Sequence, residues 1–83
     1  MKKETKTHYY PNGNKWNETP YINNKKHGLQ IWWRENGNKD CETQYVNGNI
    51  HGLEIVWNSN GKRWCETPFK NNTQHGTRID FNY

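Results

Sequence analysis

The sequence predicts an all-β protein, an antiparallel meander of β-hairpin repeats, and three observations lead to that fold class. Three dipeptides, Asn-Gly, Glu-Thr and His-Gly, each recur three times at a constant step of 24 residues. Before the later Asn-Gly dipeptides, apolar residues alternate as Leu-x-Ile-x-Trp, which is the period of a β-strand. No window shows the apolar periodicity and capping residues of a helix. Recurrence at a fixed step indicates that one supersecondary unit is stacked three times.

Each unit is predicted to contain two strands and two turns. Asn-Gly forms the first turn, because both residues tolerate positive φ angles, and the second turn ends in His-Gly. The dipeptides stand at Asn12-Gly13, Asn36-Gly37 and Asn60-Gly61, at Glu18-Thr19, Glu42-Thr43 and Glu66-Thr67, and at His27-Gly28, His51-Gly52 and His75-Gly76. About seven short strands are expected, over residues 5–10, 15–22, 29–34, 39–46, 53–58, 63–70 and 77–82.

The pairing register within a hairpin depends on which apolar residues share a face of the sheet. Ile31, Trp33 and Tyr45 are apolar positions that recur along the chain, so we expect them on one face. A strict two-residue Asn-Gly turn would instead set polar residues such as Glu42 against that face. We therefore predict a three-residue or bulged turn.

Two prolines fall inside predicted strands. Pro20 and Pro68 each follow a Glu-Thr dipeptide, in the first and third units. Proline has no N–H and removes a ladder hydrogen bond. A bulge or a strand break is therefore expected after Thr19 and Thr67.

The length and composition describe one thin domain. The 83 residues fit a single domain over 1–83, with residues 1–6 expected as a flexible tail. Hydrophobic residues make up only 29%, a share typical of disorder, but five Trp and five Tyr can each bury a large area. The net charge of +4 permits a weak attraction to nucleic acid or an anionic surface without requiring it.

The expected compartment follows from what the sequence lacks. No apolar stretch approaches the length of a membrane span or of a signal-peptide core. Two cysteines give no disulfide framework and are consistent with a reducing compartment. We expect a cytoplasmic protein, and we do not expect a membrane as its partner.

Three repeated residue types could carry chemistry, and their spacing favours structural roles. Equivalent positions in successive units lie two strands apart, about 9–10 Å. This is too far for three imidazoles to share one metal ion, or for Cys41 and Cys65 to form a disulfide. Each repeated His is expected to fix its turn by a side-chain hydrogen bond, and each repeated Glu to accept backbone donors. We predict no catalytic residue, no metal site, no cofactor and no enzymatic activity.

Three tryptophans are not required by the repeat. Trp33 and Trp57 belong to a repeating apolar column. Trp16 and Trp64, in contrast, share a column with Asp40. The extra tryptophans either cover a second apolar layer or are exposed anchors of a binding surface. Basic residues near them suit an acidic protein partner or stacked bases. The predicted partner-binding residues are Trp16, Trp32, Trp64, Arg34, Lys62 and Arg63.

Most of the chain, residues 9–81, resembles a known repeat. The residues that carry the resemblance in the first unit are Tyr10-x-Asn12-Gly13, Glu18, Tyr21 and His27-Gly28. This pattern resembles the MORN-repeat variant of small bacterial proteins, the group called YwqK-type antitoxins. The resemblance implies a sheet of β-hairpin repeats with a scaffold or protein-binding role. Some members of that group look like immunity proteins that neutralise a partner toxin.

We therefore expect a non-catalytic protein-binding module, an inhibitor or immunity-type protein that blocks a toxin or a defence effector. An antitoxin-like role and a viral anti-defence role would look alike in sequence. The alternative is binding of nucleic acid or an anionic surface by a basic, Trp-rich sheet. The exposed first and last strands could also pair two chains edge to edge as a homodimer.

Overall fold

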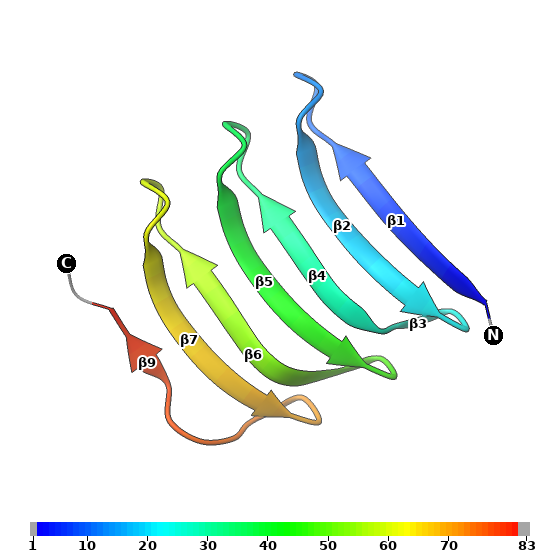
Figure 1. Cartoon of the computed structure of the whole chain (residues 1–83), viewed down its shortest axis with the longest axis vertical. Helices are drawn as coiled ribbons and strands as arrows, with labels where there is room; N and C mark the ends of the chain where they lie inside the picture. Colours follow the sequence, from blue (N-terminus) through cyan, green and yellow to red (C-terminus); the bar gives the residue numbers. More distant parts are fainter. Residues whose placement is uncertain (1, 82–83) are drawn as a thin grey trace.

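The structure is a computed structural model that describes residues 2–81, and these form one open antiparallel sheet (Figure 1). The strand order is β1-β2-β4-β5-β6-β7-β8, with β3 paired to β2 and β9 to β7. The predicted all-β hairpin meander is confirmed. Its strands are β1 (Lys3–Tyr9), β2 (Lys15–Ile22), β3 (Lys25–Lys26), β4 (Gly28–Trp33), β5 (Lys39–Val46), β6 (Asn49–Trp57), β7 (Arg63–Lys70), β8 (Thr73–Gln74) and β9 (Ile79–Asp80).

Residues 2–81 form nine strands, where the sequence predicted about seven. The two additional strands are β3 and β8, two residues each, and in the middle unit the equivalent segment is continuous with β6. The last expected strand, 77–82, is reduced to β9. Residues 3–6, expected within a flexible tail, instead form the first half of β1, because their backbone pairs with residues 19–22 of β2. Residues 1 and 82–83 lie outside the described residues.

The Asn-Gly turns contain three residues, as predicted. Between β4 and β5, the backbone N–H of Arg34 donates to the carbonyl oxygen of Asn38 at 2.7 Å. The N–H of Gly37 donates to the carbonyl oxygen of Arg34 at 2.9 Å. Gly37 has a φ of 93°, which only glycine adopts without strain. The turns at Gly13 and Gly61 contain the same two backbone hydrogen bonds.

A one-residue β-bulge follows each of these turns. In the second unit, Lys39 pairs with Trp33 across the hairpin. The next pair is Cys41 with Trp32, so Asp40 is an extra residue without a partner. The first and third units have the same shift of register, between the pairs of β1 with β2 and of β6 with β7.

The turn and the bulge cancel each other, and this decides which residues share a face. A three-residue turn alone would move the strand by one residue, but the bulge moves it back. Ile31 therefore lies opposite Glu42, and Tyr45 lies opposite Gly28 on the other face. The expectation that Ile31 and Tyr45 share a face is wrong, because the predicted turn is accompanied by a second irregularity.

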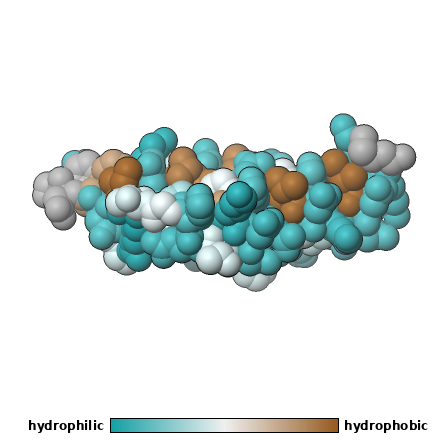
Figure 2. Space-filling model, turned by 90° about the horizontal axis from the view of Figure 1, so that it is seen from below, coloured by the Kyte–Doolittle hydropathy of each residue, from teal (hydrophilic) through white to brown (hydrophobic). Residues whose placement is uncertain are grey.

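The register gives the sheet two different faces, since residues paired across strands point to the same side. Figure 2 shows the sheet edge-on as a thin slab, 43 × 38 × 12 Å in extent, with most of its strongly hydrophobic residues along one side. The aliphatic face is defined by Leu29, Ile31, Leu53, Ile55 and Ile79. The threonine face is defined by Thr19, Thr43, Thr67, Tyr21 and Tyr45.

Burial is one-sided, and the described residues contain no second layer. Gln30 is buried on the threonine face, where its Nε2 donates to Thr19 Oγ1 at 2.8 Å. Mostly polar residues thus occupy the most buried positions, and Gln30 and Thr19 satisfy each other there by a hydrogen bond. No side chain in residues 2–81 is completely buried, so the sheet has no closed hydrophobic core. The buried residues are Asn17, Thr19, Gln30, Thr43, Cys65 and Thr67.

The irregularity predicted at Pro20 lies in the neighbouring strand and leaves β2 intact. Pro20 pairs with Thr5 of β1 inside an unbroken strand. On the other side, residues 19–20 of β2 lie opposite residues 27–30, so the next strand carries two extra residues. The N–H of His27 donates to the carbonyl oxygen of Pro20 at 3.0 Å. The ladder is therefore widened where proline offers no donor.

Candidate binding surface

Trp16 is the bulge residue of the first unit, and its indole ring lies in an aromatic cluster on the threonine face. Its ring centroid is 5.8 Å from that of Trp32, with an edge-to-face angle of 75°. The rings of Tyr10 and His8 lie 6.0 and 6.3 Å from it. Trp16 is still 42% exposed, so one side of this cluster is open to solvent.

Trp64 occupies the same bulge position in the third unit and is 55% exposed. In the second unit that position holds Asp40. A bulge residue has no partner across the ladder, so strand pairing does not dictate its side chain. Because the described residues contain no second layer, the position favours the exposed-anchor alternative for Trp16 and Trp64. Their role in binding stays a prediction.

Arg34, which the sequence placed in the binding site, connects two repeat units. Its Nη2 donates to the carbonyl oxygen of Trp57 in the next unit at 3.1 Å. The same atom lies 3.3 Å from Asp40 Oδ1. Its Nε is buried and has no hydrogen-bond partner among the residues that the structure describes. These contacts give Arg34 a structural role whatever else it binds.

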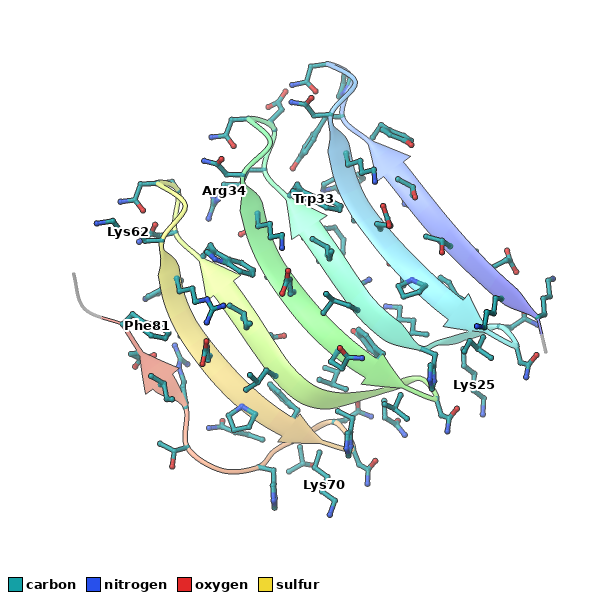
Figure 3. The ribbon with its side chains drawn as sticks, in the orientation of Figure 1. Lys25, Trp33, Arg34, Lys62, Lys70 and Phe81 are labelled. Carbon is teal, nitrogen blue, oxygen red and sulfur yellow. The ribbon has the colours of Figure 1, made fainter. Side chains whose placement is uncertain are left out.

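The other two predicted basic residues lie on the aliphatic face and in a turn. Arg63 pairs with Trp57 of the neighbouring strand, which places it on the aliphatic face, opposite the Trp16 cluster. Lys62 belongs to the last Asn-Gly turn, where its backbone N–H donates to Asn58 and Asn60 side chains at 3.2 Å. Figure 3 shows Lys62 and Arg34 at the same end of the sheet. The six predicted residues are thus divided among two faces and one turn end.

A ladder of ion pairs crosses the aliphatic face, and the sequence reading missed it. Two lysines of this ladder lie over tryptophan rings. Lys15 Nζ is 5.6 Å from the ring centroid of Trp33, and Lys39 Nζ is 5.5 Å from that of Trp57 in the next unit. The ion pairs are Lys15 Nζ to Glu18 Oε2 at 2.7 Å, Lys39 Nζ to Glu42 Oε2 at 2.6 Å and Arg63 Nη1 to Glu66 Oε2 at 2.5 Å.

The bulge explains this ladder. In a regular strand, residues three apart point to opposite faces. The extra residue at position 16, 40 or 64 brings the basic residue onto the face of its Glu. The hydrogen bond that Lys15 donates to Glu18 raises the pKa of Lys15, as expected for an ammonium beside a carboxylate. The repeated Glu residues were expected to accept backbone donors, but these side chains instead bind cations. The recurring spacing Lys/Arg-x-x-Glu was the available signal.

The contacts of the cysteines and of His27 favour structural roles for these residues. Both cysteines are free thiols, and burial, with help from Asp40, raises the pKa of Cys41 to about 11. The protonated thiol that results at neutral pH is a poor nucleophile. His27 Nδ1 accepts a hydrogen bond from the backbone N–H of Asn47 at 3.2 Å, which ties one turn to the next. His51 and His75 form no side-chain hydrogen bond within residues 2–81, so the expectation that each repeated His fixes its own turn is wrong.

Three further observations describe what the surface offers. Within residues 2–81, no group of three His, Cys, Asp or Glu side chains is placed to hold a metal ion. The same residues enclose no pocket. They also contain no helix of the length and apolarity needed to cross a bilayer. The surfaces available for contact are therefore the two broad faces, the edges and the turn ends of a flat sheet.

The fold defines a class of protein, an open sheet of β-hairpin repeats that encloses no pocket within the described residues. The profile of the MORN repeat variant matches residues 5–23, 26–47 and 50–71, most of the chain. The chain belongs to the MORN repeat variant family. MORN repeats are generally non-catalytic binding repeats, which places this chain among binding modules. No curated protein and no solved structure matches the chain.

Proposed function

We propose that this chain is a protein-binding module of the inhibitor or immunity type, which blocks a partner protein as an antitoxin or a viral anti-defence protein does. The observation that carries the binding role is the partly exposed ring of Trp16, packed against Trp32 on the threonine face. Exposed tryptophans of this kind are the residues that dominate protein–protein binding energies. The inhibitory part of the proposal rests on the resemblance to the antitoxin group.

The distribution of the tryptophans favours a large partner. Trp16 in β2 and Trp64 in β7 are separated by four strand spacings, or roughly 19 Å. No pocket lies between them within the described residues. A folded protein can contact both rings at once, whereas a small molecule cannot. The proposed contact surface is therefore the threonine face, with Trp16, Trp32 and Trp64 as its anchors.

The experiment is a capture from host lysate with the tagged protein, followed by titration of the purified captured protein. The variant Trp16→Ala/Trp64→Ala should weaken binding by about 2 kcal/mol or more, roughly 30-fold in Kd. Tyr9→Ala is the matched control, because Tyr9 is an aromatic residue, 60% exposed, on the opposite face. Equal affinities for the double variant and the control would exclude the threonine face as the contact surface.

Binding of nucleic acid is the second candidate, and the positive charge of one end of the sheet favours it. Lys25 and Lys70 lie near the His-Gly turns (Figure 3), and neither forms an ion pair within residues 2–81. Trp16 and Trp32 lie toward the Asn-Gly turns, away from these lysines. A steep loss of affinity for a nucleic-acid probe with rising salt is the expected result for this candidate, and an affinity insensitive to salt would contradict it.

A further inference from the structure

The aliphatic face is the less covered of the two faces. Seven large hydrophobic residues among those described are exposed, and two of them are the bulge tryptophans Trp16 and Trp64. The other five share the aliphatic face, where Leu53 is 46% exposed. Exposed apolar residues that gather on one face in this way mark a contact site. The five residues are Tyr9, Leu29, Val46, Leu53 and Ile79.

We propose that a second copy of this chain covers the aliphatic face, so that two sheets pack face to face as a two-layer dimer. A sheet with an apolar face is ordinarily stable only when that face is buried against another layer. Two such sheets pack about 10 Å apart with their side chains interdigitated. The dimer would leave both threonine faces outward, so the proposal is independent of the function proposed above.

The size of the face is sufficient. The sheet extends over 43 × 38 Å. A standard protein–protein interface buries roughly 800 Å² on each partner. The central part of the face, around Leu29 and Leu53, could therefore supply a stable interface while the rim stays in water.

The strand order makes the face complementary to itself. Strand β5 is central, with β4 and β6 on its two sides, and then β2 and β7. A two-fold axis parallel to β5 therefore sets β4 against β6 of the second copy, and β2 against β7. Leu29 then meets the Leu53 position of the other copy, and Pro20 meets the Pro68 position. Each contact occurs twice, as in an isologous interface.

Charge also favours an identical partner. The charged groups in the middle of the aliphatic face are already paired with one another, as Lys39 with Glu42. Each pair is neutral, so the middle parts of two such faces do not repel each other through a net charge, whereas Lys25 and Lys70 lie outside this part, near the His-Gly turns. The edges are less suitable, because β1 carries Lys3 and Lys6, and lysines on an edge strand oppose pairing with another chain.

The first test is the molar mass in solution, by light scattering and sedimentation from micromolar to sub-millimolar protein. We expect twice the 10.0 kDa of one chain for the wild type. Leu53→Lys should return the mass to that of a monomer, because it places two charges in the apolar interface. Val56→Lys is the matched control, an aliphatic residue of the same strand on the threonine face, and should stay dimeric. Circular dichroism checks that each variant retains its strands.

A cross-linking experiment covers the case in which Leu53→Lys does not fold. In a Cys41→Ser/Cys65→Ser background, Leu29→Cys/Leu53→Cys should oxidise to a covalent dimer. The two new cysteines of one chain lie two strands apart, about 9–10 Å, beyond the reach of an internal disulfide. A wild type that is monomeric throughout, a dimer that Leu53→Lys leaves intact, or the absence of covalent dimer would overturn the proposal.

Discussion

The hydroxyl of Tyr10 donates to the backbone carbonyl oxygen of Trp33, 2.7 Å away in the next repeat unit. Arg34, one unit further along, makes the equivalent contact with the carbonyl oxygen of Trp57. The residue type changes between units, but the target, a backbone carbonyl at the end of a strand, does not. Successive hairpins are thus fastened by side chains as well as by strand pairing, as expected when each unit contacts only its neighbours.

Tyr10→Phe should lower the free energy of unfolding by about 0.5–1.5 kcal/mol, because it removes one half-buried hydrogen bond and leaves the Trp33 carbonyl without that donor. The measurement is urea unfolding followed by tryptophan fluorescence. Tyr9→Phe serves as control, since the Tyr9 hydroxyl forms no hydrogen bond with the described residues and its side chain is exposed. A Tyr10→Phe protein as stable as the control would mean that this contact does not hold the units together.

Gly28→Ala should destabilise the fold more than Gly52→Ala. Both glycines have nearly the same positive φ, 115° and 112°. A Cβ on Gly28 would lie 3.0 Å from the rigid ring of Pro20, whereas a Cβ on Gly52 would meet the flexible side chain of Gln44 at 3.3 Å. Overpacking against a rigid group costs about 1–3 kcal/mol, so the difference should be measurable by thermal unfolding. Equal losses would show that only the backbone conformation matters at these positions.

The thiol of Cys41 should react slowly with iodoacetamide at neutral pH. Burial raises its pKa to about 11, so only a small fraction is thiolate until the solution is strongly alkaline. In a Cys65→Ser variant, the alkylation rate should rise toward pH 11, well above the midpoint of a free cysteine peptide. The raised pKa also makes the stability of the fold depend on pH. Between about pH 9 and 11 the folded protein keeps the proton of the Cys41 thiol, whereas the unfolded chain loses it. Stability should therefore fall as the pH rises from about 9 toward 11. An alkylation profile equal to that of the peptide would show that the thiol is open to water.

The candidate site was predictable only in part. The repeat alignment shows that one position varies among the units, as Trp16, Asp40 and Trp64. In the structure this position is the extra residue of each bulge, which has no partner across the ladder, so strand pairing does not restrict its side chain. The neighbouring basic residues were grouped with these tryptophans by proximity along the chain. Proximity along the chain fails in a strand, because successive side chains such as Arg63 and Trp64 point to opposite faces.

Local rules in the sequence determined the repeat, the hairpins and the three-residue turns. Asn and Gly accept positive φ, alternation marks strands, and a fixed step marks stacked units, so these features need no knowledge of distant contacts. The tertiary structure decided which residues share a face. That outcome depends on how many extra residues the turn and the two paired strands contain together. One extra residue moves every later side chain to the other face, and a second one moves it back. It also decided that no second layer covers the described sheet, because layer packing depends on contacts between whole elements, which a sequence pattern does not contain.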